Sequence, residues 1–552
     1  MLGDSLFLLY GAGAGAAALT LPALKARLEL SRAKHRSLAG HSRLARRVAA
    51  LVPGYAYGDD RIFRSDGAPA EVEARRRAGF GNLAVLFEKR FARTLKLTAE
   101  AKEGLSDLQF TAAYRVPFQY SAYVRERLPV GAFLEASQGS TLVDLDGNRF
   151  FDLTGSYGLN VFGYELYKAC IEEGAVRAAR LGPVLGAGYH PALAYNVRRL
   201  KEISGLDEVS FHMSGTEAVM QAVRLARYHS RRSHLVRFCG AYHGWWEGVQ
   251  PGVGNPVPQP GTYTLKDMDE DSLHVLRTRR DIACVLVNPL QALHPNRNAP
   301  GDGSLVDSGR SAGFDRAAYA AWLKALRQVC SERGIALVFD EILVGFRLAP
   351  GGAQEYFGVK ADMVTYGKTV AGGLPIGVLC GRRELMRRFH DAHPADICFA
   401  RGTFNAHPYV MTAMQVFLER LPEFARLYEG LDERWNRRVE KLNLELQREA
   451  LPIKIANLSS VWTVNYTRPS RYNWMLQYYL RAEGLALSWV GTGRFLFSLD
   501  CSEADYQAVE QRFLAAARAM ERDGWWWNDQ ALTNKTIKRQ IFREMLARRL
   551  QL

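Results

Sequence analysis

Four short segments of the 552-residue chain combine chemically able side chains with small residues, and each follows a short apolar run. They are Ser214-Gly215-Thr216-Glu217-Ala218, Gly240-Ala241-Tyr242-His243-Gly244, Asp340-Glu341-Ile342 and Tyr366-Gly367-Lys368-Thr369. Together they offer hydroxyl groups beside a helix start, an aromatic ring, a carboxylate and an amine. Such a set suits a phosphorylated, planar ligand and nucleophilic chemistry at the amine.

The segment Ser214 to Ala218 is predicted to open a helix that continues as AVMQAVRLARYH. Free backbone N–H groups and the helix dipole favour a phosphate there. Ser214 as N-cap and Glu217 as capping-box acid explain the same residues without a ligand. The segment alone leaves both interpretations open.

The segment around Tyr242 and His243 is rich in glycine and aromatic residues and continues with Trp245-Trp246. Glycine permits close backbone approach, and an aromatic side chain at a strand end can stack on a flat heteroaromatic ring. The alternative is an aromatic loop packed on the core.

Asp340 closes the buried apolar run IALVF, so its carboxylate must find a partner. A protonated ring nitrogen would serve. The alternative is an ion pair with a nearby arginine, for which Arg347 is the candidate.

Lys368 stands at the end of the buried run MVTY and is followed by a flexible Gly-Gly turn. Desolvation there would lower the proton affinity of its amine, although most lysines extend into solvent. Gly367-Lys368-Thr369 also resembles part of a nucleotide-binding P-loop. That motif needs a glycine at position 362, where this chain has Asp362, so nucleotide binding is excluded.

Apolar, β-branched runs alternate with helical stretches between about residues 206 and 404. The predicted strands are residues 209–211, 234–239, 282–287, 335–339 and 363–366, and residues 317–333 form a predicted helix that ends at Gly334. This alternation predicts an α/β fold with a doubly wound, mostly parallel sheet whose ligands bind at the carboxyl ends of the strands.

Outside this region the sequence predicts smaller elements. Residues 141–154 read as a hairpin around Asp146-Gly147-Asn148. Long amphipathic helices follow Pro408, with two strands near residues 459–466 and 494–499. These segments predict a second α/β lobe, in which we expect Trp525-Trp526-Trp527 to be buried.

The four segments, together with Arg401-Gly402-Thr403-Phe404-Asn405-Ala406-His407-Pro408, resemble the ordered motifs of class-III aminotransferases over about residues 120 to 520. The GFR sequence after DEI and the GTFNAHP form look most like the glutamate-1-semialdehyde aminomutase branch. The resemblance implies fold type I and the cofactor pyridoxal 5′-phosphate (PLP).

On matching positions, the resemblance implies a role for each site residue. Lys368 would hold PLP as a Schiff base and carry the proton, and Asp340 would pair with the pyridine nitrogen. Ile342 would pack on one face of the ring and Tyr242 would stack on the other, with His243 also at the cofactor. Ser214, Gly215 and Thr216 would bind the phosphate. Thr403 would reach the cofactor phosphate of a neighbouring subunit, because family members form homodimers.

Three positions depart from the family pattern. Asn288-Pro289 replaces the usual Glu-Pro, Leu343 stands where Gln or Met is common, and Val344 replaces the usual Thr. A charge near the cofactor is thereby lost, which leaves the substrate open.

From these patterns we predict five segments. They are an apolar and basic N-terminal segment (1–50), a helical extension (51–115), the N-terminal part of a small domain (116–200), a large PLP-binding domain (201–408) and a C-terminal part of the small domain with a basic tail (409–552).

The net charge of +15 is concentrated near the ends of the chain. No nucleic-acid module, zinc-ligand spacing or other metal motif is present in the sequence, and the seven scattered cysteines are typical of reduced thiols in the cytoplasm. Residues 5–24 are uncharged and precede a basic cluster, so they are a candidate anchor to the inner face of a membrane. A helix docked on the protein itself is the alternative.

Three functions follow from the sequence. The leading one is a PLP-dependent aminotransferase that moves an amino group between an amine donor and a carbonyl acceptor, which we expect to be hydrophobic or carrier-bound. The second is a glutamate-1-semialdehyde-type 2,1-aminomutase, which needs no external amine. The third is a non-catalytic, membrane-associated homologue.

Overall fold

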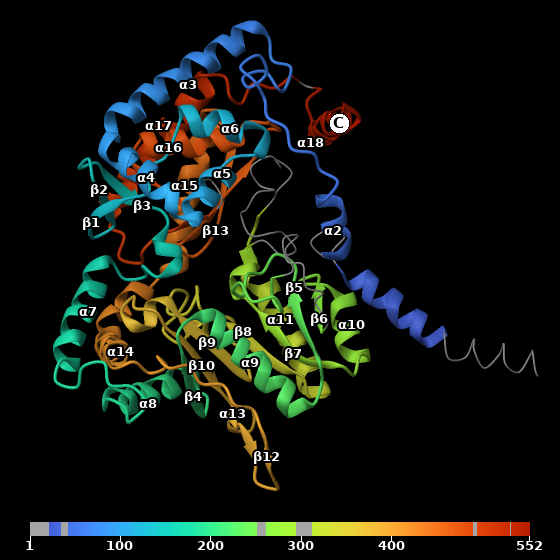
Figure 1. Cartoon of the computed structure of the whole chain (residues 1–552), viewed down its shortest axis with the longest axis vertical. Coiled ribbons are helices and arrows are strands. Elements are labelled where there is room, and N and C mark those ends of the chain that lie inside the picture. Colours follow the sequence, from blue (N-terminus) through green and yellow to red (C-terminus); the bar gives the residue numbers. More distant parts are fainter. Residues whose placement is uncertain are drawn as a thin grey trace, which may run out of the picture.

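The computed structural model describes residues 21–34, 42–250, 261–293, 312–488, 494–529 and 531–551. Figure 1 shows a large sheet with its helices in the lower part of the molecule and a helix-rich lobe above it. The upper lobe combines segments from both ends of the chain, since α3 and α4 lie there together with α15, α16 and α17.

The large sheet has seven strands in the order β4-β10-β9-β8-β7-β5-β6. Their bounds are β4 (Glu208–His212), β5 (His234–Phe238), β6 (Thr262–Leu265), β7 (Ile282–Val287), β8 (Ala336–Asp340), β9 (Met363–Gly367) and β10 (Gly377–Gly381). Neighbouring strands from β9 to β6 pair in parallel, and β10 runs antiparallel to both β4 and β9. The predicted α/β fold with a mostly parallel sheet is confirmed.

Helices cover both faces of this sheet. They are α7 (Tyr164–Ala178), α8 (Ala192–Ser204), α9 (Gly215–Ser230), α10 (Glu270–Thr278), α11 (Arg316–Arg333), α12 (Gly352–Phe357), α13 (Arg383–Met386) and α14 (Pro408–Arg420). Because strand side chains alternate between faces, Leu235 packs in one core cluster with α9, while its neighbour Val236 packs in the other with α11. Helix α11 ends at the left-handed Gly334, as predicted.

The second lobe is built around two smaller sheets. The first has the order β1-β2-β3-β15, with β1 (Leu134–Gln138), β2 (Thr141–Asp144), β3 (Arg149–Asp152) and β15 (Leu485–Ala486). The second contains β13 (Ile453–Leu458), β14 (Val461–Tyr466) and β16 (Arg494–Leu496). Strands β2 and β3 form the predicted hairpin, and β15 joins the C-terminal segment to it.

The remaining elements are helical, apart from one short hairpin. They are a helix at 21–33, α2 (Ser42–Ala49), α3 (Ala70–Arg90), α4 (Ala92–Gly104), α5 (Ser106–Tyr114), α6 (Phe118–Arg127), α15 (Leu431–Arg448), α16 (Leu476–Ala482), α17 (Glu503–Arg522) and α18 (Asn534–Gln551). The hairpin of β11 (Phe389–His390) and β12 (His393–Ile397) extends from the large sheet in Figure 1.

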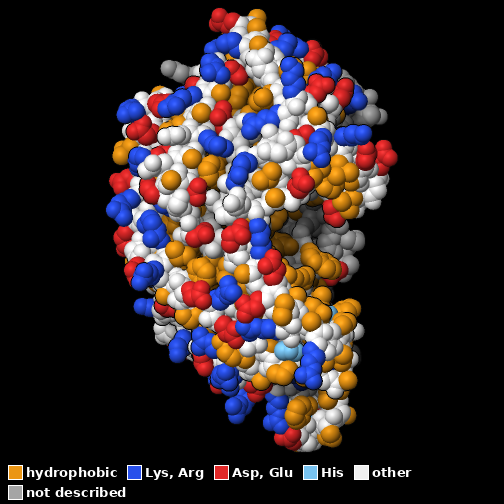
Figure 2. Space-filling model, turned by 90° about the vertical axis from the view of Figure 1, so that its left-hand side faces the viewer, with side chains coloured by type: hydrophobic (Ala, Val, Ile, Leu, Met, Phe, Trp, Pro, Cys, Tyr) orange, Lys and Arg blue, Asp and Glu red, His pale blue; other side chains and the backbone are white. Residues whose placement is uncertain are grey.

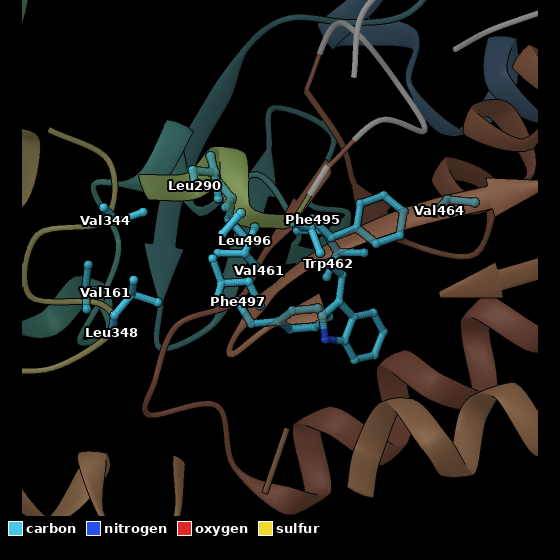
Figure 3. Close-up of a cluster of buried hydrophobic side chains, with 14 of the residues drawn as sticks. Val161, Leu290, Val344, Leu348, Val461, Trp462, Val464, Phe495, Leu496 and Phe497 are labelled. Carbon is cyan, nitrogen blue, oxygen red and sulfur yellow. The ribbon is translucent and has the colours of Figure 1, made fainter. Parts of the chain in front are cut away.

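One apolar core joins the two lobes. Figure 3 shows Leu290, from the loop after β7, beside Leu496 and Val461 of the second lobe, with Phe497 and Trp462 next to them. Val344, from the loop after β8, lies with Val161 and Leu348 in the same view. All of these side chains are buried in one cluster. The second lobe therefore packs against the loops that follow β7 and β8 and holds them in place.

Two tryptophans of the predicted buried cluster lie in the core of the upper lobe. Trp525 and Trp526 are buried, and their indole nitrogens donate to Tyr479 Oη and Asn473 Oδ1 at 2.7 and 3.1 Å. The predicted burial is confirmed for these two rings, whereas Trp527 is only half-buried.

The N-terminal apolar run lies almost entirely outside the described residues, which begin at Leu21. Within the described ranges, no helix is both long enough and apolar enough to cross a membrane. Anchoring through residues 5–24 stays a prediction.

The helical extension is tied into the upper lobe by a buried ion pair. The guanidinium of Arg76 binds both carboxylate oxygens of Asp66 at 2.9 and 2.7 Å, and both side chains are inaccessible to solvent. Arg76 Nε also donates to the carbonyl of Gly524, which follows α17. One arginine therefore connects α3 to the C-terminal part of the chain.

Replacing Arg76 is predicted to destabilise the protein far more than replacing its neighbour. Arg76→Met leaves Asp66 buried and unpaired, so the free energy of unfolding should fall by about 3–5 kcal/mol. Arg77→Met removes an exposed pair with Asp59 and should cost less than about 1 kcal/mol. Urea denaturation of the two variants measures both values, and similar losses would contradict the structural role of the buried pair.

Candidate active site

The four chemically able segments meet at one edge of the large sheet. Strands β4, β5, β8 and β9 point in the same direction, so the segments that end or follow them share the carboxyl edge. Asp340 is the last residue of β8, and Lys368 directly follows β9. The predicted position at the strand ends is therefore observed.

Tight packing at glycines brings all four of these segments into contact. A Cβ on Gly215 would lie 2.4 Å from Cδ1 of Ile342, and one on Gly367 would lie 3.3 Å from Cγ2 of the same side chain. A Cβ on Gly244 would lie 2.4 Å from Oγ1 of Thr216. Larger residues at positions 215 and 244 would force Ile342 or Thr216 to move.

The carboxylate of Asp340 is buried and held from two sides. Its Oδ2 lies 2.8 Å from Nδ1 of the buried His243. Its Oδ1 accepts from the Ile342 N–H at 3.2 Å and the Thr365 hydroxyl at 3.3 Å. Since a carboxylate offers about four acceptor positions, Oδ2 keeps capacity for one more donor.

The predicted alternative partner of Asp340, Arg347, lies elsewhere. The Arg347 guanidinium is buried and donates to the carbonyls of Phe497 and Asn160 and to the Ser460 hydroxyl. The ion-pair alternative is therefore wrong. Arg347 instead joins the loop after β8 to the second lobe.

His243 has one nitrogen in use and one without a partner. Its Nε2 is buried and has no hydrogen bond within the described part of the chain. An unsatisfied buried polar atom is unfavourable, and such atoms recur at sites that bind another group. His243 therefore keeps one buried nitrogen that a bound group could engage.

Lys368 is held in a left-handed backbone conformation, with φ of 50°. A residue other than glycine in this region carries strain of about 1–3 kcal/mol, which the surrounding structure must offset. Burial lowers the pKa of the Lys368 amine, the Asp340 charge acts in the opposite direction, and Arg494 lowers it further. The side chain is partly buried, so the solvent-extended alternative does not describe it. No hydrogen bond or ion pair engages this amine among the described residues.

The N-terminus of α9 shows the predicted capping interaction. The Ser214 hydroxyl accepts from the Glu217 N–H at 3.3 Å, and the Glu217 carboxylate accepts from the Met213 N–H at 2.9 Å. The helix start at Gly215 and Thr216 remains only partly buried. The cap therefore leaves this helix end accessible to an anion.

Tyr242 lies at the open side of the site. Its side chain is 57% exposed, and Trp245 in the same loop is 73% exposed. The alternative of a loop packed fully on the core is therefore wrong for these two rings, although Trp246 packs against a core cluster. The Tyr242 ring is available to contact a ligand or another chain.

Asn288 connects the loop after β7 to the Tyr242 loop. Its Nδ2 donates to the Tyr242 carbonyl at 3.0 Å, and its Oδ1 accepts from the Leu290 N–H at 3.2 Å. The amide thus uses a donor that a carboxylate lacks, which gives the departure from Glu a structural reason.

Two residues near the site had no signal in the sequence. Arg494 begins β16 in the second lobe, yet its charge affects the pKa of Lys368. Gly158 lies in a turn with Ser156 and Tyr157, both at positive φ, and its Cβ would meet Leu343 Cγ at 2.8 Å. Both come from segments far from the motifs, so only the folded chain reveals them.

Thr403 does not join the other residues in the structure of the single chain. It is exposed in the loop before α14, and none of the hydrogen bonds found among the described residues links it to Lys368 or Asp340. Phe399 and Phe404 nearby are 67% and 52% exposed.

Comparison with known proteins covers most of the chain. The model of the family described as Aminotransferase class-III matches residues 122–516. The glutamate-1-semialdehyde 2,1-aminomutase of Alkaliphilus oremlandii is 33% identical over 345 residues, which cover 59% of this chain and 76% of that protein. The protein of the same name from Citrifermentans bemidjiense is 30% identical over 388 residues, covering 66% and 84%.

A solved structure shows the same fold. A glutamate-1-semialdehyde-aminomutase from Pseudomonas aeruginosa PAO1 superposes with a TM-score of 0.64, at 18% identity, over 82% of this chain and 99% of that chain. At this identity the likeness supports the fold alone. Helices α3, α4 and α5 precede the family match.

Proposed function

Because the chain belongs to the class-III aminotransferase family and is therefore a PLP-dependent enzyme, we propose that Lys368 anchors the cofactor. We further propose that the enzyme transfers an amino group between an amine donor and a carbonyl acceptor. The observation that carries this proposal is the partly buried, unpartnered amine of Lys368 within electrostatic reach of the buried Asp340.

The residues present fit this cofactor. Lys368 supplies an amine with a lowered pKa, and Asp340 keeps one acceptor position for a ring nitrogen. His243 Nε2 is a buried polar atom without a partner in the described structure. Glycine at positions 215 and 244 lets Ile342 and Thr216 keep their places at the site, since a Cβ at either position would displace one of them. When bound, PLP acts as an electron sink for the carbon that carries the amino group.

Asp340 has the role of holding a proton at the pyridine nitrogen. Hydrogen bonds from His243, Ile342 and Thr365 fix its two oxygens. Because both oxygens are oriented before any ligand binds, little reorganisation is needed. Ile342 would form one wall of the ring site, and the exposed ring of Tyr242 the other.

Lys368 has the role of attaching the cofactor and then moving a proton. Burial lowers the pKa of its amine, so a larger share is neutral near pH 7 than for an exposed lysine. A neutral amine can attack a carbonyl carbon and can accept a proton. The strained conformation at φ 50° fixes where this amine starts.

The start of α9 has the role of binding the phosphate group. The N–H groups of Gly215 and Thr216 are not needed by the Ser214 cap, which uses the Glu217 N–H. The helix dipole adds a favourable field for a dianion. The Thr216 hydroxyl packs against Gly244, where an added Cβ would lie 2.4 Å from its Oγ1. This hydroxyl therefore lies between the two loops that would enclose the phosphate.

An intramolecular aminomutase is the second candidate function. The relatives with this name are 30–33% identical to the chain, which favours it. The two reactions use the same Lys368 and Asp340 chemistry and differ in whether an external amine is required. The third hypothesis, a non-catalytic membrane-associated homologue, is not supported by membership of an enzyme family.

We propose that two copies of the chain assemble, so that Thr403 of one reaches the cofactor phosphate of the other. The exposed side chains of Ile397, Phe399 and Phe404 flank Thr403, and contiguous exposed apolar groups mark interaction surfaces. Figure 2 shows apolar side chains gathered around a hollow on one face of the molecule. Thr403 has no role at the site of its own chain. In the proposed dimer it would act at the site of the second chain.

The amine requirement separates the two candidate reactions. Holoenzyme given single amines or amino acids, without an acceptor, should release one carbonyl product per active site for at least one donor. Lys368→Ala should slow this release about 100-fold or more, because the proton carrier is lost. Quantifying the carbonyl product by mass spectrometry gives the result. No carbonyl release from any donor, together with repeated turnover of glutamate 1-semialdehyde alone, would establish the aminomutase instead.

Assembly through the Thr403 loop is open to a direct test. Phe399→Asp should shift the enzyme from dimer to monomer in sedimentation velocity and weaken PLP binding. Phe542→Asp, at a 63% exposed position on α18, is the matched control and should leave the dimer intact. A wild-type monomer that binds PLP tightly would contradict the proposal.

A further inference from the structure

A cavity lies in the upper lobe, away from the proposed active site at the carboxyl edge of the large sheet. It has a volume of about 290 Å³ and lies among α4, α5, α6 and Tyr478 of α16. Figure 1 shows these helices in the upper lobe, well above the sheet strands. None of the residues proposed to contact PLP lines this cavity.

The cavity wall is apolar with cations and no acid. Its apolar residues include Leu95, Leu108, Val116, Val124, Leu128 and Val130, of which Val116, Val124 and Leu128 are buried. The charged residues that line it are Lys102, Arg115 and Arg125. Because no Asp or Glu lines it, the cavity combines an apolar body with a purely positive rim.

Arg115 is the distinctive cation of this wall. Its side chain is partly buried, and burial lowers the pKa of its guanidinium. No hydrogen bond, ion pair or ring contact engages this guanidinium among the described residues. A partly buried guanidinium without a protein partner can bind the anionic group of a ligand that enters the cavity.

Other arginines of the upper lobe are satisfied. Arg76 binds Asp66, and Arg471 binds Glu544 at 2.9 Å. Arg481, whose pKa is lowered first by burial and then by the Arg115 charge, donates to the Gly131 carbonyl and lies over the Phe150 ring. Arg115 differs from these three arginines, since none of the described residues accepts a hydrogen bond from its guanidinium, and Arg481 adds a second positive charge.

We propose that this cavity binds a small amphipathic carboxylate, with the carboxylate on Arg115 and the hydrocarbon body among the apolar side chains. A guanidinium can bind a carboxylate through two parallel hydrogen bonds, and the neighbouring Arg481 favours an anion electrostatically. The volume corresponds to about ten heavy atoms if each takes about 30 Å³, as a water does in the liquid, so it suits a chain of about ten carbons whose carboxylate oxygens lie at Arg115. A medium-chain fatty acid fits this description.

The extension that precedes the family match forms part of the cavity wall. The lining residues from Leu95 to Val116 precede residue 122, where the family match begins. The site is thus independent of the proposed amino transfer, and its occupancy can be measured without turnover.

Decanoate is the probe for this site, titrated into the holoenzyme by isothermal calorimetry below its micellar concentration. Wild-type enzyme should bind about one decanoate per chain. Arg115→Met should weaken decanoate binding about tenfold or more, because a charge-assisted interaction is lost. Decanol, which has the same body without the charge, should bind wild type and Arg115→Met equally.

Two further variants complete the experiment. Arg93→Met removes an exposed arginine of α4 that does not line the cavity, so decanoate binding should be unchanged. Ala112→Trp should abolish binding of both probes by filling the space. Arg115→Met should unfold at the wild-type temperature, since no partner of Arg115 is lost. Absence of saturable decanoate binding to wild type, or equal affinity of Arg115→Met, would overturn the proposal.

Discussion

The central constraint of this protein is a partly buried lysine amine near a buried carboxylate, with no hydrogen-bond partner for that amine in the described parts of the chain. Burial makes the neutral amine of Lys368 more populated, while Asp340 limits how far its pKa falls. His243, Thr365 and the Ile342 N–H orient the two oxygens of Asp340. The left-handed conformation at Lys368 completes this arrangement, and the rest of the fold keeps it in place.

The sheet and the second lobe together position the residues of the site. Parallel strands bring Asp340 and Lys368 to one edge, and glycines at 215 and 244 let the loops of that edge touch. The second lobe holds the loops after β7 and β8 in place, because Leu290 and Val344 of these loops share a buried core with Leu496. The extension before residue 122 enters the same core and brings the Arg76 ion pair and the Arg115 cavity. Lobe packing and site geometry are therefore coupled.

The sequence was informative wherever a feature is local. Apolar runs identified β7 and β8, and Gly334 identified the end of α11, because strand burial and helix capping depend on neighbouring residues. Lys368 and Asp340 were found by their positions after such runs. Pairing across the fold was not predictable in the same way: Arg347 was the expected partner of Asp340, and His243 is the observed one. Arg494 and Arg115 gave no signal, because their surroundings are formed by distant segments.

The attachment of the cofactor to Lys368 is the claim on which the account depends. Reduction of the holoenzyme with borohydride, followed by proteolysis and mass spectrometry, locates the lysine that carries PLP. The account predicts the cofactor mass on the peptide containing Lys368 and on no other, and its loss in Lys368→Ala. Labelling of another lysine, such as the exposed Lys360, or an unchanged amount of bound cofactor mass in Lys368→Ala, would contradict it.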